Sequence, residues 1–92
     1  MARMSSAEIE GELASLPEWR YEGERLRRRF TFGDFPAAFA FMTRCAFAAE
    51  KMDHHPDWTN VYNKVDVVLW THDAGGITKK DFALARAMEA VK

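Results

Sequence analysis

The longest regular pattern of apolar residues in the chain has helical spacing. Apolar side chains recur every three or four residues over about seventeen positions, which predicts an amphipathic helix with one buried face. The expected core face consists of Phe35, Ala38, Phe39, Met42, Ala46, Ala49 and Met52. Asp34 can cap the first turn, where Pro36 is tolerated. His55-Pro56 is expected to close the helix, because the residue before a proline is pushed out of helical geometry.

Two shorter helical patterns lie near the ends of the chain. Ser5 and Glu8 have the spacing of a capping box, and the apolar residues after them predict a helix at about 6–15, stopped by Pro17. Thr78 can cap a last helix. The residues expected to face inward from that helix are Ile77, Leu84, Ala85, Met88 and Val91.

Between the helical segments the apolar residues alternate with polar ones, which predicts strands. Trp19 and Tyr21 begin a hairpin that turns at 22–24. Its second strand places Leu26, Arg28, Phe30 and Phe32 on one face and Arg25, Arg27, Arg29 and Thr31 on the other. A second hairpin is expected from strands at about 59–63 and 64–72, carrying Val61, Val65, Val67 and Leu69, before a turn at 74–76.

The order of these elements defines a fold class. Helix, two strands, helix, two strands and helix predict an α+β fold, in which a four-stranded antiparallel sheet carries three helices on one face. Ninety-two residues suffice for one modest core, so residues 1–92 are expected to form a single domain.

Charge and cysteine usage narrow the possible functions. Thirteen basic and fourteen acidic residues give a net charge of −1, so no global positive field attracts nucleic acid or an anionic membrane. The arginines at 25–29 could bind phosphate, but a solvated strand surface is the favoured interpretation. Cys45 has no partner for an internal disulfide, and a buried structural thiol is favoured over a nucleophile. With no secretory signal or membrane span apparent, we expect a cytoplasmic protein.

Three histidines lie close together in the second half of the chain. His54 and His55 leave the long helix and His72 ends the last strand, while Glu50 shares a helical face with His54. Imidazoles near neutral pH can deliver and remove protons, and a carboxylate can fix their tautomer. The alternatives are C-terminal helix caps, or zinc ligands, although the spacing matches no common zinc pattern. Asp81 completes a capping box with Thr78 or supports His72.

The assembled motif identifies a resemblance. Glu50-Lys51-Met52-Asp53-His54-His55-Pro56-Asp57-Trp58, then Asn60 to Val65, then Thr71-His72-Asp73-Ala74-Gly75-Gly76-Ile77-Thr78 and Asp81, resemble the pterin-4a-carbinolamine dehydratases. The similarity extends upstream through Phe32 to Ala49 and more loosely to Trp19. A lone His-His-Pro is weak evidence, whereas a third histidine eighteen positions after the first and an acid nine further on are specific.

The resemblance implies a four-stranded antiparallel sheet with helices on one face, and the dehydration of 4a-hydroxytetrahydropterin to quinonoid dihydropterin. It implies catalytic roles for His54, His55, His72 and Glu50, and pterin contacts from His54-His55-Pro56 and Thr71-His72-Asp73-Ala74, with Asp81 and Trp58 in support. Pterin is then the substrate, no cofactor or metal is expected, and the functional partner is an aromatic amino acid hydroxylase. The alternative is a protein-binding module on the same fold, acting as a dimerisation cofactor or an assembly factor.

The strand at 64–72 also predicts self-association. If Val65, Val67 and Leu69 face the helices, Lys64, Asp66, Val68, Trp70 and His72 face the other way. Val68 and Trp70 are then costly to leave in water, unless they belong to the pterin cleft. Because the resemblance implies dimers joined into tetramers, we expect a homo-oligomer that uses this face and an edge strand.

Overall fold

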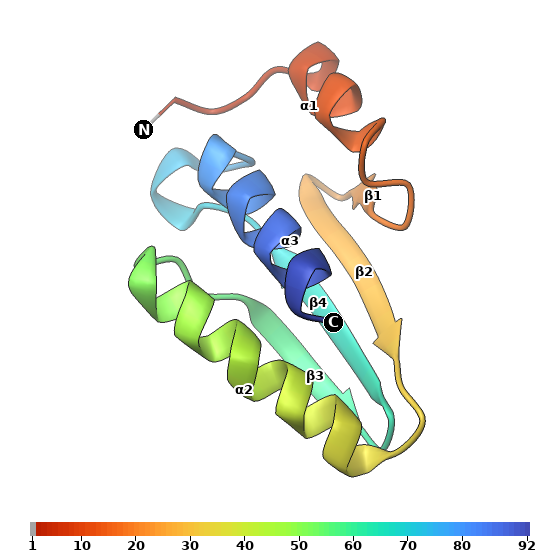
Figure 1. Cartoon of the computed structure of the whole chain (residues 1–92). Coiled ribbons are helices and arrows are strands. Elements are labelled where there is room, and N and C mark those ends of the chain that lie inside the picture. Colours follow the sequence, from red (N-terminus) through yellow and green to blue (C-terminus); the bar gives the residue numbers. More distant parts are fainter. Residues whose placement is uncertain (1) are drawn as a thin grey trace.

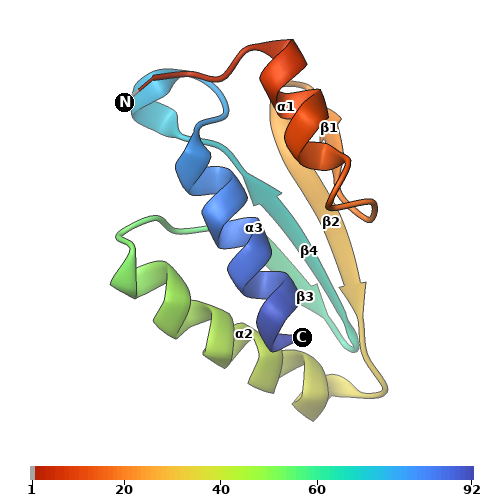
Figure 2. The same ribbon diagram turned by 45° about the horizontal axis from the view of Figure 1, so that its top comes forward.

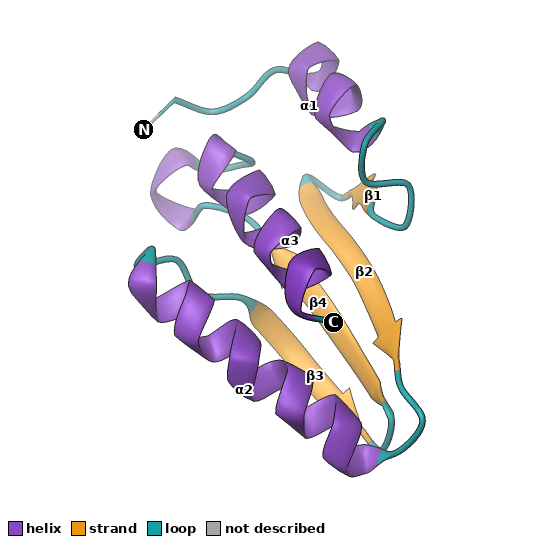
Figure 3. Ribbon diagram, in the orientation of Figure 1, coloured by secondary structure: helices purple, strands orange, loops and turns teal. Residues whose placement is uncertain are grey.

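The computed structural model describes residues 2–92 and contains the predicted alternation of helices and hairpins (Figure 1; Figure 3). The elements are α1 (Ser6–Leu13), β1 (Arg20–Glu22), β2 (Arg25–Thr31), α2 (Phe35–Lys51), β3 (Asp57–Val61), β4 (Lys64–Leu69), the short 3-10 helix η1 (His72–Ala74) and α3 (Lys79–Val91). No helix in this part of the chain is long and apolar enough to cross a membrane.

The four strands form one antiparallel sheet in the order β1-β2-β4-β3. The helices α2 and α3 lie across one face of this sheet, and no helix of residues 2–92 covers the opposite face (Figure 1; Figure 2). The predicted α+β class is therefore confirmed. Alternation in β4 is also confirmed, because Val65, Val67 and Leu69 are buried under the helices while the residues between them are half-exposed.

The face that α2 buries agrees only in part with the predicted one. Ala38, Met42, Ala49 and Met52 face the core as predicted, whereas Phe35, Phe39 and Ala46 do not. The buried residues of α2 are Ala38, Phe41, Cys45 and Ala49, with Met42 and Met52 packed beside them. Phe35 and Phe39 are 47% and 54% exposed, and Ala46 is exposed as well. Apolar residues lie on most sides of this helix, so helical periodicity alone does not decide which of two apolar faces is buried. Packing selects the one whose small alanines let the helix approach its neighbours closely.

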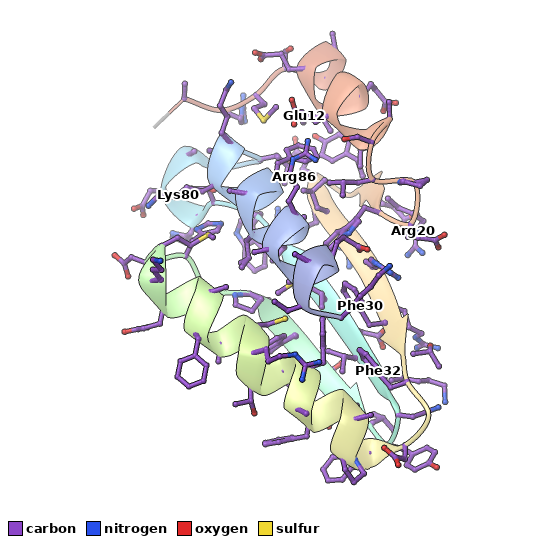
Figure 4. All side chains as sticks on the ribbon, in the orientation of Figure 1. Glu12, Arg20, Phe30, Phe32, Lys80 and Arg86 are labelled. Atoms are coloured by element: carbon purple, nitrogen blue, oxygen red, sulfur yellow. The ribbon has the colours of Figure 1, made fainter. Side chains whose placement is uncertain are left out.

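The core is built around aromatic rings between sheet and helices. Phe30 of β2 and Phe32, which follows that strand, are labelled in Figure 4. Both contact Phe41 of α2, with ring centroids 4.5 and 4.9 Å apart, respectively. Cys45 is fully buried in the same core, and burial raises the pKa of its thiol to about 12. This thiol is therefore structural and unreactive, as expected.

One charged residue on the inner face of the sheet has a partner that the sequence did not reveal. Arg28 forms an ion pair with Glu89 of α3 at 2.5 Å, and Glu89 also accepts from Trp19 Nε1 at 2.9 Å and from Lys92 Nζ at 2.9 Å. The Arg28 guanidinium lies over the Phe30 ring at 3.9 Å. These contacts fasten the C-terminal end of α3 to the sheet.

Several boundaries differ from the predicted ones. The first helix ends at Leu13, and the second hairpin turns at Tyr62 and Asn63, with Tyr62 at a φ of 52°, so its strands are 57–61 and 64–69. Val61 is 71% exposed because it lies opposite Lys64, on the face of the sheet that no helix of residues 2–92 covers. The chain leaves the sheet after Leu69, which places His72 in η1 and not at the end of a strand.

Candidate functional site

The turn that ends α2 determines where His54 points. Asp53 adopts a φ of 51°, its N–H donates to the Glu50 carbonyl, and the His54 N–H donates to the Ala49 carbonyl. These two bonds form a Schellman motif, which reverses the chain before Pro56 and not at it. The helix ends at Lys51, before Pro56 could influence it, so the predicted role of His55-Pro56 in closing it is wrong.

The reversal directs His54 toward the beginning of α3. Its Nε2 lies 2.5 Å from Oδ1 of Asp81, which is fully buried, and the His54 side chain is only 11% exposed. The predicted pairing of Glu50 with His54 is therefore wrong, because the helix does not persist far enough to align them. The carboxyl group that contacts His54 belongs instead to Asp81, twenty-seven positions further along the chain.

Asp81 is held on its other oxygen as well. Oδ2 accepts from the Thr78 N–H at 2.9 Å and from Thr71 Oγ1 at 2.8 Å. The Thr71 and Thr78 hydroxyls are 2.7 Å apart. Because Thr71 gives its single proton to Asp81, Thr78 donates to Thr71. Every partner of the carboxyl group can act as a donor, which is the environment of a carboxylate that fixes an imidazole ring.

This network assigns two roles to Asp81. It completes the predicted capping box with Thr78 at the start of α3, and it orients His54. The sequence indicated the cap but not the second role. The sequence gives little indication that Thr71 and Thr78 contact each other and Asp81. A glycine turn separates the two threonines, and only the fold brings their hydroxyls together.

The second histidine of the motif has a different environment. His55 Nε2 lies 3.0 Å from Glu50 Oε1, and both side chains are open to solvent, at 59% and 81% exposed. Glu50 therefore contacts the neighbouring histidine and not the one predicted. Adjacent residues at a chain reversal point apart, so His54 turns inward while His55 faces outward.

The third histidine lies on η1, next to the buried network. Thr71 pairs with Gly76 across an isolated bridge, and Gly75 closes the turn with a φ of 68°. This small loop leaves the His72 side chain 93% exposed, with Nδ1 3.8 Å from Asp73 Oδ1. In the described chain no hydrogen bond joins the His72 ring to His54 or His55. Thr71 nevertheless places His72 directly beside the residue that contacts Asp81.

The other predicted site residues surround these groups. Pro56 and Ala74 are half-buried, Asp73 is exposed, and Trp58 of β3 packs against the core. Among residues 2–92, no three His, Cys, Asp or Glu side chains are grouped so that they could hold a metal ion.

The arrangement provides a proton-exchanging group with a fixed orientation. With Nε2 committed to Asp81, His54 retains Nδ1, which makes no hydrogen bond within residues 2–92. A ring held in this way can accept a proton at Nδ1 when neutral and donate one when charged. His55 and His72 provide two further imidazole groups, both exposed at the surface.

Comparisons with known proteins agree on one family. Residues 2–91 match the model of the family described as pterin 4 alpha carbinolamine dehydratase. Two proteins provisionally named pterin-4-alpha-carbinolamine dehydratase are similar to the chain. The protein of Rhizorhabdus wittichii is 58% identical over 86% of this chain and 84% of its own length. The protein of Chelativorans sp. is 53% identical over 96% and 92%.

A solved structure is similar over nearly the whole chain. It is a transcriptional coactivator/pterin dehydratase from Brucella melitensis, with a TM-score of 0.94 and 44% identity over 97% of both chains.

Proposed function

Because the chain belongs to the pterin 4 alpha carbinolamine dehydratase family, a family of hydro-lyases, we propose that it dehydrates 4a-hydroxytetrahydropterin to quinonoid dihydropterin. The observation that carries the proposal is the buried His54–Asp81 pair, which fixes one imidazole and leaves its Nδ1 to exchange protons. In this role the protein recycles a tetrahydrobiopterin-type cofactor after an aromatic amino acid hydroxylase has used it.

The reaction requires only proton transfers. The C4a–O bond breaks as the leaving hydroxyl takes a proton, and water departs. The lone pair of the adjacent nitrogen forms the new C=N bond, and a ring nitrogen then loses a proton, so one proton enters and one leaves. General acid and base groups of near-neutral pKa supply both steps, typically with about 10²–10⁴-fold acceleration.

We assign the two proton transfers to His54 and His72, with His55 contributing to substrate binding. His54 is the ring whose tautomer is fixed by Asp81, and the exposure of His72 permits contact with a substrate. Glu50 holds His55. Pro56, Thr71, Asp73 and Ala74 complete the proposed pterin-binding segments, and Trp58 supports them.

The direct test is stopped-flow absorbance of chemically generated 4a-carbinolamine, with and without the protein. His54→Ala and His72→Ala should each lower kcat/KM by about 10²-fold or more, because each removes one proton transfer. His55→Ala should act mainly by raising KM. The circular dichroism spectrum serves as the control for folding. Near-native rates in folded His54→Ala and His72→Ala would contradict the assignment.

We also propose that catalysis needs no metal or other cofactor, since neither proton transfer requires a Lewis acid. Activity should survive exhaustive chelation verified by elemental analysis. Activity that disappears with a metal and returns when the metal is restored would overturn this part of the proposal.

A second candidate function is binding of another protein. It is favoured by one observation, the description of the Brucella melitensis relative as a transcriptional coactivator as well as a pterin dehydratase. A protein that binds a partner but leaves carbinolamine decay at its uncatalysed rate would support this second function against the first. The three histidines favour the enzyme, because a scaffold has no need of them.

A further inference from the structure

A concentration of arginines lies on the sheet face that no helix covers, far from the histidines in sequence. Arg20 of β1 lies directly opposite Arg27 of β2, and Arg29 lies opposite Asp66 of β4. Residues opposite one another across antiparallel strands share a face, so Arg20, Arg27 and Arg29 project to the same side. Like charges placed directly opposite each other destabilise a sheet, and nothing in the packing of the core requires arginine at these positions.

The positive charge here exceeds the negative charge. Asp66 is bound by Arg29 through two hydrogen bonds of 2.8 and 3.0 Å. The pKa of the Asp66 carboxyl is lowered first by this bond, against a smaller effect of burial, and further by the charges of Arg20 and Lys64. One carboxylate thus has three cations around it. In the described part of the chain neither Arg20 nor Arg27 forms an ion pair, and Arg27 Nε donates only to the Glu22 carbonyl at 3.2 Å.

A hollow of about 430 Å³ lies on this face of the sheet, among the side chains of Arg20, Arg27, Arg29, Asp66 and Val68. Arg28 and Val67 also line it, but their side chains point to the opposite face. Glu22 and Asp57 lie on the same face by register, but neither lines the hollow. Small-molecule sites have volumes of this order and combine apolar surface with a few charged groups. Val68 supplies the apolar surface, and the arginines supply the charge.

We propose that this hollow binds a small phosphorylated molecule, with the phosphate held by Arg20 and Arg27 and the remainder resting against Val68. The guanidinium is planar and presents paired donors, which match the oxygens of a phosphate. Arg29 can turn from Asp66 to join them. A small ligand fits better than a nucleic acid, because the basic surface is confined to one hollow on a chain whose net charge is −1.

The first experiment is calorimetric titration of the full chain with pyrophosphate at low ionic strength, where surface charges are least screened. Saturable binding of one pyrophosphate per chain is expected. Arg20→Gln and Arg27→Gln should each weaken it about tenfold or more, since each removes charge-assisted hydrogen bonds. The matched control is Arg44→Gln, which removes the same charge from an exposed position on α2, on the other side of the sheet. Equal weakening by all three variants would overturn the proposal, because it would indicate only non-specific attraction.

A substitution with the opposite expected effect makes the test sharper. Asp66→Asn removes the carboxylate that competes for Arg29, so pyrophosphate binding should become several-fold tighter. Unchanged or weaker binding in a folded Asp66→Asn protein would count against the site. ATP should bind more tightly than pyrophosphate, because its sugar and base can rest against Val68, and adenosine alone should not bind. Affinity that grows with the length of a single-stranded oligonucleotide and exceeds that for ATP would overturn the assignment to a small molecule.

Discussion

At the scale of single residues, the buried carboxyl group of Asp81 has the largest effect on the site. It caps α3 through the Thr78 N–H and holds His54 at 2.5 Å, so one side chain links the start of a helix to the orientation of a histidine. A buried carboxylate is tolerated only when its oxygens are fully hydrogen-bonded, and here Thr71 completes the set. The geometry of His54 and the stability of this corner are therefore coupled.

We predict that Asp81→Asn lowers kcat by up to about 100-fold, on the proposed function. The Asn oxygen can still accept from Thr78, but an amide N–H facing His54 Nε2 forces the proton of the neutral ring onto Nδ1. The wrong ring nitrogen is then available to act as a base. The stability cost should be about 1–3 kcal/mol, from the lost charge-assisted bond. The measurements are the pH profile of kcat/KM and urea unfolding.

The control for this prediction is Asp66→Asn, which removes a carboxylate from the opposite face of the sheet and should leave the rate unchanged. If Asp81→Asn is destabilised but keeps both its native rate and its native pH profile, Asp81 is a helix cap and has no influence on His54.

At the scale of elements, the end of α3 is fastened by the cluster around Glu89. Burial, the largest single influence, raises the pKa of Glu89, but hydrogen bonds from Arg28, Lys92 and Trp19 together outweigh it and lower the pKa from 4.5 to about 2. A carboxyl group whose pKa is lower in the folded state stabilises the fold above its unfolded pKa. That contribution is lost as the pH falls toward the folded value.

We predict that Glu89→Gln destabilises the protein at pH 7 by roughly 2 kcal/mol, because Arg28 and Lys92 lose their common partner. The difference in unfolding free energy between the wild type and this variant should shrink between about pH 4.5 and 2, where Glu89 becomes protonated in the folded state. Urea unfolding at several pH values measures it. The control is Glu10→Gln, on an exposed position of α1. A difference that stays constant across this pH window would contradict the linkage.

At the scale of the whole molecule, two surfaces can support the expected homo-oligomer. The uncovered sheet face carries Val68 and Trp70, but the Arg25 guanidinium lies 4.1 Å from the centroid of the Trp70 ring and covers part of it. The outward face of α2 carries Phe35, Phe39 and Phe47, which are 47%, 54% and 74% exposed. Exposed aromatic rings on one helix form an apolar patch, and such patches commonly mark protein interfaces.

We predict that the protein forms a homo-oligomer, most simply a tetramer, and that Phe39→Glu shifts its mass in light scattering toward a smaller species. Trp70→Glu tests the uncovered sheet face in the same way, because Trp70 directly follows the central strand β4. If only Trp70→Glu changes the mass, the sheet face is the interface; if only Phe39→Glu does, α2 is. A wild-type chain that remains monomeric at tens of micromolar would contradict association through either surface.

The sequence alone determined those features whose partners are close in the chain. The capping boxes at Ser5 and Thr78 and the cap at Asp34 join residues three positions apart, so local reading located the starts of all three helices. The alternation of apolar and polar residues determined which side chains of β4 face the helices, because successive side chains of a strand point to opposite faces of the sheet. The histidine motif likewise identifies the family without any geometry, because its residues lie at fixed positions in the chain.

Only the tertiary structure decided the features that depend on distant residues. The partner of His54 is Asp81, because the turn at Asp53 reverses the chain where a continued helix would have paired His54 with Glu50. Arg28 and Glu89 meet from positions sixty-one residues apart. The buried face of α2 was also determined only in part, since apolar residues lie on more than one side of it. In each case several local arrangements satisfy the sequence, and packing against elements elsewhere in the chain selects one.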